Sequence, residues 1–399
     1  MSRLIAPRPL PPLPRPLAVH PDVHAARTLP GEFYRDPAWF AWQREALFAR
    51  AWHLAPSLAT VRAEGEAHPF TLLPGCLDEP LVALHDGARA RCLSNVCTHR
   101  AMPLVAAPCT RKTLRCGYHG RRFGLDGRCL GAPGFDDLPA QGDQGARDDD
   151  LAAVATAWWR ALPFVSLDPD APFADWLGDA AERLAMLPID KLLYDPSGAR
   201  SYTVHAHWAL YVENYLEGLH VPFVHPGLAR ALAMGQYRTE LLSSSVLQVG
   251  AARPEDAGLM PVDPSRPDDR AAAYYLWLFP GLMLNFYPWG LSVNAVVPEA
   301  YDRTRVDYLR YVWDAARLGE GAGGDLDTVE REDDAVVESV QRGIGARAYA
   351  GGRYAPGWEA GVHAFHRRVS AVAEAAQRSD GIRDSMTACT PGGTAARKS

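Results

Sequence analysis

Two short segments, Cys97-Thr98-His99 and Cys116-Gly117-Tyr118-His119, decide how this chain is interpreted. Each segment places one thiol and one imidazole within a single turn of loop. Two cysteines and two histidines suit a tetrahedral zinc ion, and they also suit a [2Fe–2S] cluster in which two histidines replace two cysteines on one iron. Zinc fingers usually group cysteine with cysteine and histidine with histidine, whereas each segment here carries one of each. The spacing therefore favours a cluster gripped by two loops, with both thiolates on the buried iron and both imidazoles on the outer one.

The residues around these segments resemble the cluster-binding half of a Rieske non-haem iron oxygenase alpha subunit. The resemblance extends to Gly120, to Phe123 and to the Asp126-Gly127 turn. Rieske proteins of respiratory complexes carry one further cysteine in each loop, and the two form a disulfide. Met102 and Tyr118 stand at those places here, so the loops resemble the oxygenase type.

Composition sets the outer limits of the interpretation. The 399 residues are enough for two domains, and 48% hydrophobic with 22% charged residues is ordinary for a globular protein. A net charge of −6 gives no reason to expect nucleic acid or an anionic membrane as partner. No run of about 18 apolar residues predicts a membrane-spanning helix. The seven cysteines are an odd number and the cluster claims two, so we expect a reducing cytoplasm rather than a disulfide framework.

The chain divides into four predicted regions. Residues 1–34 are a Pro-rich arm, expected to run extended and either to dock on a neighbouring subunit or to stay loose. Residues 35–168 are the expected Rieske [2Fe–2S] domain, with a helical pattern over 36–52 and then short strands between Gly, Pro and Asp turns. Residues 169–377 are the expected mononuclear iron catalytic domain, and residues 378–399 a disordered polar tail.

The predicted fold class is α+β. An N-terminal antiparallel β domain, whose last strand covers 158–165, precedes a domain in which helices pack on an antiparallel sheet; the resemblance implies the helix-grip (START-like) architecture for the latter. The helices expected in the second domain cover 173–187, 207–220, 326–341 and 357–377. The strands expected there cover 201–204, 274–279, 283–287, 291–297 and 305–313.

A second metal site is predicted from His220 and His225, which lie on either side of an expected helix end because Pro222 disfavours continuing the helix. Two histidines and one carboxylate form the facial triad of non-haem Fe(II) oxygenases. The resemblance puts the carboxylate at the start of a long C-terminal helix. Asp333 is the expected ligand there, with Asp334 as its competitor, although acidic residues also stabilise a helix N-terminus by themselves.

Glu217 precedes His220 by three residues, so a helix would present both on one face. The resemblance implies that the acid at this position links a cluster histidine of one subunit to an iron-ligating histidine of the next, fixing both tautomers. Asn214, one turn earlier, is the second candidate beside the iron. The family usually has Asn-Trp-Lys before this helix, whereas this chain has His207-Trp208-Ala209; His205 and His207 are interpreted as structural.

The resemblance implies an oxygenase component that uses O2, one Rieske [2Fe–2S] cluster and one mononuclear Fe(II) to hydroxylate a small organic substrate. No G-x-G-x-x-G follows a predicted strand, and no plant-type ferredoxin cysteine run is present. Electrons are therefore expected from a separate NAD(P)H-dependent reductase, with or without a ferredoxin. The resemblance also implies a homotrimer in which the cluster of one subunit serves the iron of its neighbour.

The substrate is left open between a quaternary amine and an aromatic ring, and so is mono- versus dioxygenation. Residues 214–225 look more like the choline and carnitine monooxygenase branch than like naphthalene-type dioxygenases. Aromatic side chains can hold a cation against their faces or stack on a ring. An alternative function is an electron-transfer or ligand-binding Rieske protein without a working mononuclear iron site. The candidate pocket residues, of which more than half are expected to be core, are Tyr275, Trp277, Phe286, Tyr287 and Trp289.

Overall fold

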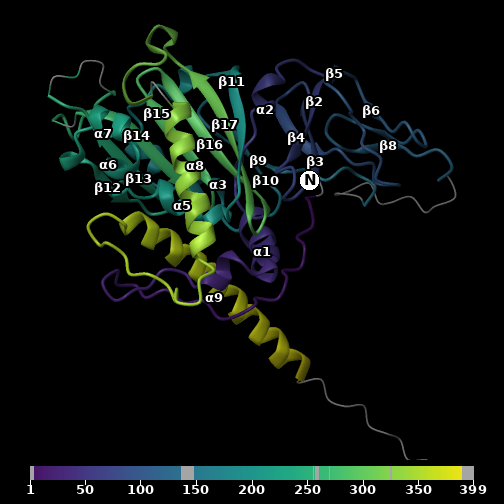
Figure 1. Ribbon diagram of the computed structural model, residues 1–399. Helices are drawn as coiled ribbons and strands as arrows, with labels where there is room; N and C mark the ends of the chain where they lie inside the picture. Colours follow the sequence, from purple (N-terminus) through teal and green to yellow (C-terminus); the bar gives the residue numbers. More distant parts are fainter. Residues whose placement is uncertain are drawn as a thin grey trace, which may run out of the picture.

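The computed structural model describes residues 4–135, 148–254, 256, 260–268, 270–323 and 326–388. Within these ranges the strands form antiparallel sheets: three small ones, ordered β1-β10-β9, β4-β3-β2-β5 and β6-β7-β8, and a seven-stranded one, ordered β11-β17-β16-β15-β14-β13-β12. Figure 1 shows the small sheets on one side of the large sheet, with β5, β6 and β8 farthest from it. The α+β class, with an antiparallel β domain ahead of a helix-covered antiparallel sheet, is confirmed.

The strands of the first domain are short, as the frequent turn residues predict. The strand expected over 158–165 is wrong, because Arg160 adopts a φ of 53° and turns the chain, so that β9 and β10 form a hairpin. The elements are β1 (His53–Leu54), α2 (Ser57–Thr60), β2 (Glu66–Leu72), β3 (Glu79–His85), β4 (Ala90–Ser94), β5 (Cys109–Thr110), β6 (Leu114–Arg115), β7 (Arg122–Phe123), β8 (Cys129–Gly131), β9 (Ala155–Trp159) and β10 (Leu162–Ser166).

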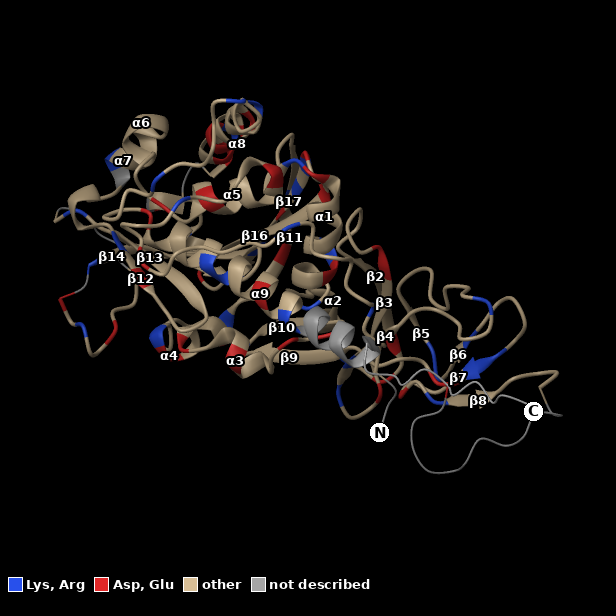
Figure 2. Cartoon of the chain, turned by 90° about the horizontal axis from the view of Figure 1, so that it is seen from below, with Lys and Arg blue, Asp and Glu red and all other residues tan. Residues whose placement is uncertain are grey.

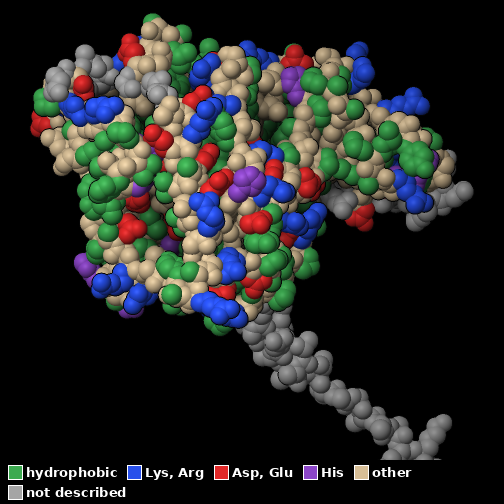
Figure 3. All heavy atoms as spheres, viewed as in Figure 1, with side chains coloured by type: hydrophobic (Ala, Val, Ile, Leu, Met, Phe, Trp, Pro, Cys, Tyr) green, Lys and Arg blue, Asp and Glu red, His purple; other side chains and the backbone are tan. Residues whose placement is uncertain are grey.

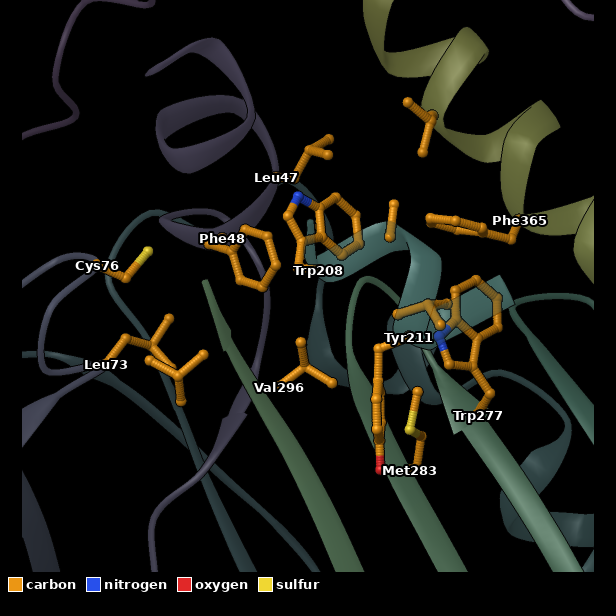
Figure 4. Close-up of a cluster of buried hydrophobic side chains, with 14 of the residues drawn as sticks. Leu47, Phe48, Leu73, Cys76, Trp208, Tyr211, Trp277, Met283, Val296 and Phe365 are labelled. Atoms are coloured by element: carbon orange, nitrogen blue, oxygen red, sulfur yellow. The ribbon is translucent and has the colours of Figure 1, made fainter. Parts of the chain in front are cut away.

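The helical segment before this domain joins it to the second one. After a 3-10 turn (Gly31–Tyr34), α1 (Pro37–Gln43) begins with Pro at its first position, and the Asp36 carboxylate caps it by accepting the Ala38 N–H at 2.8 Å. A π-helical turn (Arg44–Phe48) follows. It places the Phe48 ring 4.9 Å from that of Trp208, inside the hydrophobic cluster of Figure 4. Trp39 and Trp42 of α1 belong to the same cluster, so the first helix packs with the core of the catalytic domain.

The large sheet separates two hydrophobic layers because alternate side chains of a strand face opposite sides. Trp277 and Met283 face the layer that contains α5 and α9, as Figure 4 shows. Leu276 and Leu284 face the layer built from β9, β10, α3 and α4. The strands are β11 (Leu193–Val204), β12 (Arg238–Leu241), β13 (Ser245–Ala251), β14 (Ala271–Leu278), β15 (Leu282–Tyr287), β16 (Gly290–Ala300) and β17 (Arg303–Val312).

Two of the predicted helices are broken by turns. The helix expected over 173–187 divides at Gly178, whose φ is 58°, and the helix expected over 207–220 ends at Tyr215. The helices are α3 (Phe173–Leu177), α4 (Ala180–Arg183), α5 (Trp208–Tyr215), α6 (Val221–Val224), α7 (Pro226–Ala231), α8 (Leu326–Gly343) and α9 (Ala360–Ala388), with 3-10 turns at Ile189–Lys191, Met234–Gln236, Ala315–Arg317 and Gly321–Gly323.

Both chain ends differ from expectation. The N-terminal arm runs extended but packs on α9 of its own chain, where the Val19 N–H donates to Ser370 Oγ at 3.1 Å and His363 Nε2 donates to the His20 carbonyl at 2.8 Å. The disordered tail expected from residue 378 is wrong for 378–388, which continue α9; 389–399 lie outside the described residues. Among the described helices, none is long and apolar enough to cross a membrane.

Candidate functional site

The two cysteine–histidine loops adopt the same turn. The N–H of each cysteine donates to the carbonyl five residues onward, at 2.9 Å from Cys97 and at 2.8 Å from Cys116. The N–H of the residue four places onward donates back to the cysteine carbonyl, at 3.0 Å from Ala101 and 3.2 Å from Gly120. These two residues have positive φ angles, 54° and 74°. The repeat seen in the sequence is therefore a repeat of backbone conformation.

The four predicted cluster ligands lie together in these loops. The thiols of Cys97 and Cys116 are buried and within hydrogen-bonding range of each other, whereas the His119 ring is exposed and lies 4.6 Å from that of His99, centroid to centroid. Burial raises the pKa of the Cys97 thiol; at Cys116 it also acts upward, but backbone N–H groups of the loop outweigh it and lower the pKa. Buried thiols beside outer imidazoles are the donor set that a two-histidine [2Fe–2S] cluster requires.

Arg121 and Met102 hold the two loops against each other. The buried Arg121 guanidinium donates to Thr98 Oγ1 at 2.9 Å and to the Asp149 carboxylate at 2.7 Å. The Met102 methyl group packs so closely on Gly117 that a Cβ there would lie 3.2 Å from it. A side-chain hydrogen bond and side-chain packing thus join the loops where a respiratory Rieske protein has its disulfide.

His220, His225 and Asp333 converge on one point from three segments of the chain. One ligand atom of each lies within 4.8 Å of the other two. Asp333 Oδ1, from α8, is 2.9 Å from His225 Nε2 and 3.5 Å from His220 Nε2. His220 immediately precedes α6, and His225 immediately follows it. Two imidazole nitrogens and one carboxylate oxygen facing a common point form the donor set of a facial-triad iron site.

A further carboxylate contacts the other ring nitrogen of each histidine. Glu217 Oε1 lies 2.5 Å from His220 Nδ1, and Glu332 Oε2 lies 2.7 Å from His225 Nδ1. Each carboxylate can accept the Nδ1 proton, which fixes the tautomer and turns Nε2 toward Asp333. Burial acts to lower the pKa of His225, but its contacts with Asp333 and Glu332 outweigh burial and raise it. The surroundings of the triad therefore favour positive charge.

The contact between Glu217 and His220 arises differently from the sequence expectation. The prediction of a shared helix face is wrong, because α5 ends at Tyr215 and both residues lie in the turn after it. In that turn the Glu217 carboxylate also accepts the backbone N–H groups of Leu219 and His220. Gly218 allows this close fold, since a Cβ there would lie 2.8 Å from the Tyr237 ring. Glu217 therefore shapes the turn that presents His220.

The neighbouring acids Asp333 and Asp334 face different surroundings. The expectation that they lie at the start of a helix is wrong, because α8 begins at Leu326 and holds them in its middle. Asp333 faces the histidines, whereas the Oδ1 atom of Asp334 has no hydrogen-bond partner among the described residues. Burial, followed by the nearby charges of Asp333 and Glu338, raises the pKa of Asp334 to about 7. The structure thus brings Asp333, rather than its competitor, to the two imidazoles. His205 and His207 do not join this group.

A pocket of about 720 Å³, its open mouth included, lies over the triad. Asn214 lines it, as does Glu217. None of the described lining residues is a Lys or Arg, and the acidic ones are Glu217, Glu330 and Asp333. The pocket is thus rich in aromatic and acidic groups and is of a size for a small ligand. Its tyrosines are Tyr211, Tyr215, Tyr237, Tyr275 and Tyr287.

Only two of the five predicted aromatic residues, Tyr275 and Tyr287, line this pocket. Trp277 and Phe286 belong to the hydrophobic layers on the two faces of the sheet. Trp289 stacks behind Tyr287, with ring centroids 5.4 Å apart. More than half of the set is therefore core, in agreement with the expectation.

A hydrogen-bonded chain across the pocket was not predicted. The Tyr215 hydroxyl donates to Asn285 Oδ1 at 2.8 Å, Asn285 Nδ2 donates to Asn294 Oδ1 at 2.9 Å, and Asn294 Nδ2 lies 3.2 Å from Glu330 Oε1. The signal in the sequence was the one asparagine within each of two largely apolar strands, β15 and β16, because a buried amide needs partners. Glu332 gave no such signal, since its role depends on where His225 lies.

Comparison with known proteins agrees with this geometry. The family model for the Rieske [2Fe-2S] domain matches residues 52–141, and the model for the ring hydroxylating alpha subunit (catalytic domain) matches residues 192–375. Choline monooxygenase, chloroplastic, from Beta vulgaris is 28% identical over 355 residues, covering 86% of this chain and 76% of that protein. The carnitine monooxygenase oxygenase subunit of Escherichia coli is 28% identical over 362 residues, covering 85% and 89%.

Solved structures share the fold. A quaternary ammonium Rieske monooxygenase superposes with a TM-score of 0.70 at 23% identity, covering 89% of this chain and 99% of that one. Naphthalene 1,2-dioxygenase from Rhodococcus sp. gives a TM-score of 0.66 at 19% identity, covering 87% and 94%. With both domain models matched in this order over more than half of its length, the chain belongs to the Rieske oxygenases as an alpha subunit, a family whose members hold a [2Fe–2S] cluster and a mononuclear iron.

Proposed function

We propose that this chain is the oxygenase component of a system that monooxygenates a small cationic amine. One observation carries the proposal: the pocket over His220, His225 and Asp333 is lined by five tyrosines and by acids, with no Lys or Arg among its described residues. Aromatic faces and carboxylates together attract an ammonium group. The relatives named for choline and carnitine oxidation, which align with most of the chain, support the same class.

The proposed ligands follow from the donor sets. Cys97, Cys116, His99 and His119 would hold the [2Fe–2S] cluster, which fits two buried thiols in contact and two adjacent outer imidazoles. The triad of His220, His225 and Asp333 would hold the mononuclear iron, which fits three ligand atoms within 4.8 Å. When bound, the two centres would supply electron transfer and O2 activation. In the overall reaction one oxygen atom enters a substrate C–H bond, and the other leaves as water with two electrons and two protons.

The protein side chains hold protons and exclude water in this proposal. Glu217 and Glu332 keep the Nδ1 protons of His220 and His225, so both Nε2 atoms stay available as ligands. The tyrosines of the pocket surround the substrate with ring faces and displace bulk water. Asn214 would contact the substrate from the pocket wall, a role that rests on its place in the lining.

We propose a separate NAD(P)H-dependent reductase, with or without a ferredoxin, as the electron donor. Lys and Arg residues lie on the segments around the cluster loops (Figure 2), and such a rim suits an acidic electron-transfer protein. A reducing cytoplasm is the proposed setting, on the ground of the cysteine content. The exposed basic residues of the rim are Arg111, Lys112, Arg115, Arg122 and Arg128.

A homotrimer is part of the proposal. In Figure 1 the cluster loops near β6 lie at one end of the chain, and α6, which separates the two histidines, lies at the other. The side chains of Tyr118 in a cluster loop and of Phe223 on α6 are 64% and 82% exposed, and Figure 3 shows hydrophobic side chains at both ends. Head-to-tail contact would cover both and bring Glu217 of one subunit to a cluster histidine of the next.

The test is anaerobic purification with metal and sulfide analysis, followed by assays with a surrogate reductase. We expect two acid-labile sulfides and three irons per chain, two from the cluster and one from the triad, and a low-average-g Rieske signal after dithionite reduction. Quaternary amines should be oxidised, whereas naphthalene and other simple aromatics should not. Turnover of aromatics alone would overturn the proposed substrate class. Two irons per chain with no turnover would favour the electron-transfer alternative.

A further inference from the structure

Glu330 is a buried carboxylate in the pocket wall with an unusual set of partners. Its side chain lies on α8, one helical turn before Asp333, and the residue is 8% exposed. Oε2 accepts hydrogen bonds from the hydroxyls of Tyr308 at 2.6 Å and Tyr211 at 2.9 Å. Oε1 receives only the 3.2 Å contact from Asn294. All three donors are neutral, so they orient the carboxylate without neutralising its charge.

No cationic side chain balances this carboxylate in the described chain. Glu330 forms no ion pair with Lys, Arg or His there. Arg200 lies over the Tyr308 ring, 5.5 Å from its centroid, but its guanidinium pairs with Asp327 at 2.7 Å. A buried carboxylate without a counter-charge is costly. Burial, followed by the charge of Asp333, accordingly raises the pKa of Glu330 to about 7.

An iron ion in the triad does not explain the Glu330 charge. Three other carboxylates already surround that point: Asp333 as a ligand, Glu217 on His220 and Glu332 on His225. These acids offset the two positive charges of the metal without Glu330. What remains is a carboxylate that lines the pocket and whose Oε1 has one long contact with a neutral amide.

We propose that Glu330 is the specificity-determining residue that pairs with the positively charged nitrogen of the substrate, with Tyr211, Tyr308 and Asn294 holding it in place. This inference rests on the proposed function, since it names the counter-charge of the cationic amine. Because Glu330 and Asp333 are three residues apart on one helix, the rise between them is about 4.5 Å. A small ammonium ion paired with Glu330 would therefore hold its neighbouring carbon atoms close to the triad.

The test compares two ligands of nearly the same shape that differ in charge. Choline carries a quaternary nitrogen, and 3,3-dimethylbutan-1-ol replaces it by carbon. Binding of each to the anaerobic holoenzyme is measured by calorimetry for the wild type, Glu330→Gln, Glu330→Asp and Glu338→Gln. Glu338 lies on the same helix outside the pocket, where it accepts the His205 N–H, so its variant controls for the loss of one negative charge on α8.

We expect Glu330→Gln to weaken choline binding by about 10- to 100-fold, as removal of a close charge in a partly buried site requires, and to leave binding of the neutral alcohol unchanged. Glu330→Asp keeps the charge and should recover part of the preference for choline, and Glu338→Gln should behave as wild type. Iron and sulfide contents should be the same in all four proteins, which separates substrate pairing from a structural role.

Three results would contradict the proposals, and each has a different meaning. If wild type prefers choline and Glu330→Gln keeps that preference, Glu330 is not the counter-charge. The same conclusion follows if Glu330→Gln weakens the binding of both ligands equally, and in either case the cationic-amine function stands. If wild type binds the neutral alcohol as well as it binds choline, the proposed substrate class itself is wrong. Loss of iron in Glu330→Gln would assign Glu330 to the metal site and also overturn the inference.

Discussion

The two candidate metal centres are built in opposite ways. The cluster loops encode their ligands locally: each cysteine and its histidine belong to one turn, and the same turn is used twice, around Cys97 and around Cys116. The triad has no such local unit. His220 and His225 flank α6, and Asp333 reaches them from α8, with each histidine oriented by a carboxylate from a different segment.

This difference determines what each centre depends on. The cluster loops lie in the first domain, held by Arg121, Met102 and their own backbone hydrogen bonds. The triad depends on the packing of α5, α8 and the large sheet, which hold its segments together. A substitution that removes a ligand at one centre should therefore leave the other centre intact. A substitution that disturbs the core of the catalytic domain should affect the triad before it affects the cluster.

The largest effects are expected from removing one ligand at each centre. His225→Ala should lower the iron content from three to two per chain and reduce product formation to background, because two remaining ligands cannot hold the metal. Its Rieske EPR signal should be that of wild type. Cys116→Ser should do the reverse, removing the cluster signal and both sulfides while the mononuclear iron stays bound.

Metal analysis, sulfide analysis and EPR on both variants complete this test. The prediction that the two centres are independent would be contradicted if either variant lost both metal centres while its circular dichroism spectrum stayed that of wild type. The triad assignment would be wrong if His225→Ala still oxygenated substrate.

Substitutions of the neighbouring acids Asp333 and Asp334 test which carboxylate is the third ligand of the triad. Asp333→Asn should lose the mononuclear iron, because its carboxylate is the one that faces both Nε2 atoms. Asp334→Asn should retain the iron. Its stability should equal or exceed that of wild type by up to about 1 kcal/mol, because it replaces an acid whose buried Oδ1 has no described partner. Iron content and urea unfolding measure the two effects. Retained iron in Asp333→Asn, with loss in Asp334→Asn, would reverse the assignment.

A smaller effect is expected from Glu332→Gln, which keeps the shape of the side chain but removes the negative acceptor from His225 Nδ1. Carboxylates behind metal-bound histidines typically contribute about 10- to 100-fold in metal affinity. We expect a loss of that size in Fe(II) affinity, measured by competition with a chelator, with an unchanged cluster spectrum. Glu338→Gln on the same helix is the matched control. Equal Fe(II) affinity in both variants would remove Glu332 from the metal site.

Candidate ligands for both centres could be proposed from local spacing, whereas the contacts that support the triad could not. Ligands within one turn, such as Cys97 and His99, are visible as a motif, and so is the His220–His225 spacing. The contact of Glu332 with His225 and the chain from Tyr215 to Glu330 exist only after distant segments have packed together. No local pattern records such contacts.

The wrong helix boundaries have local causes that outweighed helix propensity. Residues 216–220 keep a helical spacing of apolar residues, yet Glu217 captures two backbone N–H groups and ends the helix. At Gly178 a φ of 58° and the close approach of Ser243 break the predicted helix. The antiparallel strands, by contrast, lie in the apolar and aromatic runs from which they were predicted, because one face of the sheet packs on each hydrophobic layer.

An indirect effect is predicted for a residue that supports the triad from outside the site. His207 is fully buried and caps α5, with Nδ1 accepting the Ala209 N–H at 3.2 Å and Nε2 donating to Gln43 Oε1 at 2.9 Å. The contact through Nδ1 requires the neutral ring, because a protonated Nδ1 cannot accept a hydrogen bond, and burial lowers the pKa of His207 to about 3. The unfolded chain protonates this ring near its ordinary pKa of about 6.5, so stability is lost as the pH falls below that value.

Between pH 7 and pH 5 this histidine should cost wild type about 2 kcal/mol of unfolding free energy. His207→Asn keeps a capping oxygen but has no titrating ring, so its loss over this interval should be smaller than that of wild type by about the same amount. Urea unfolding of both proteins at the two pH values measures this difference, which does not depend on how much the substitution destabilises the protein at pH 7. Since α5 leads directly into the turn of Glu217 and His220, iron should be released from wild type at pH 5 before the cluster loops change. Identical pH dependence of the unfolding free energy in the two proteins would show that protonation of His207 does not destabilise the segment that leads to the triad.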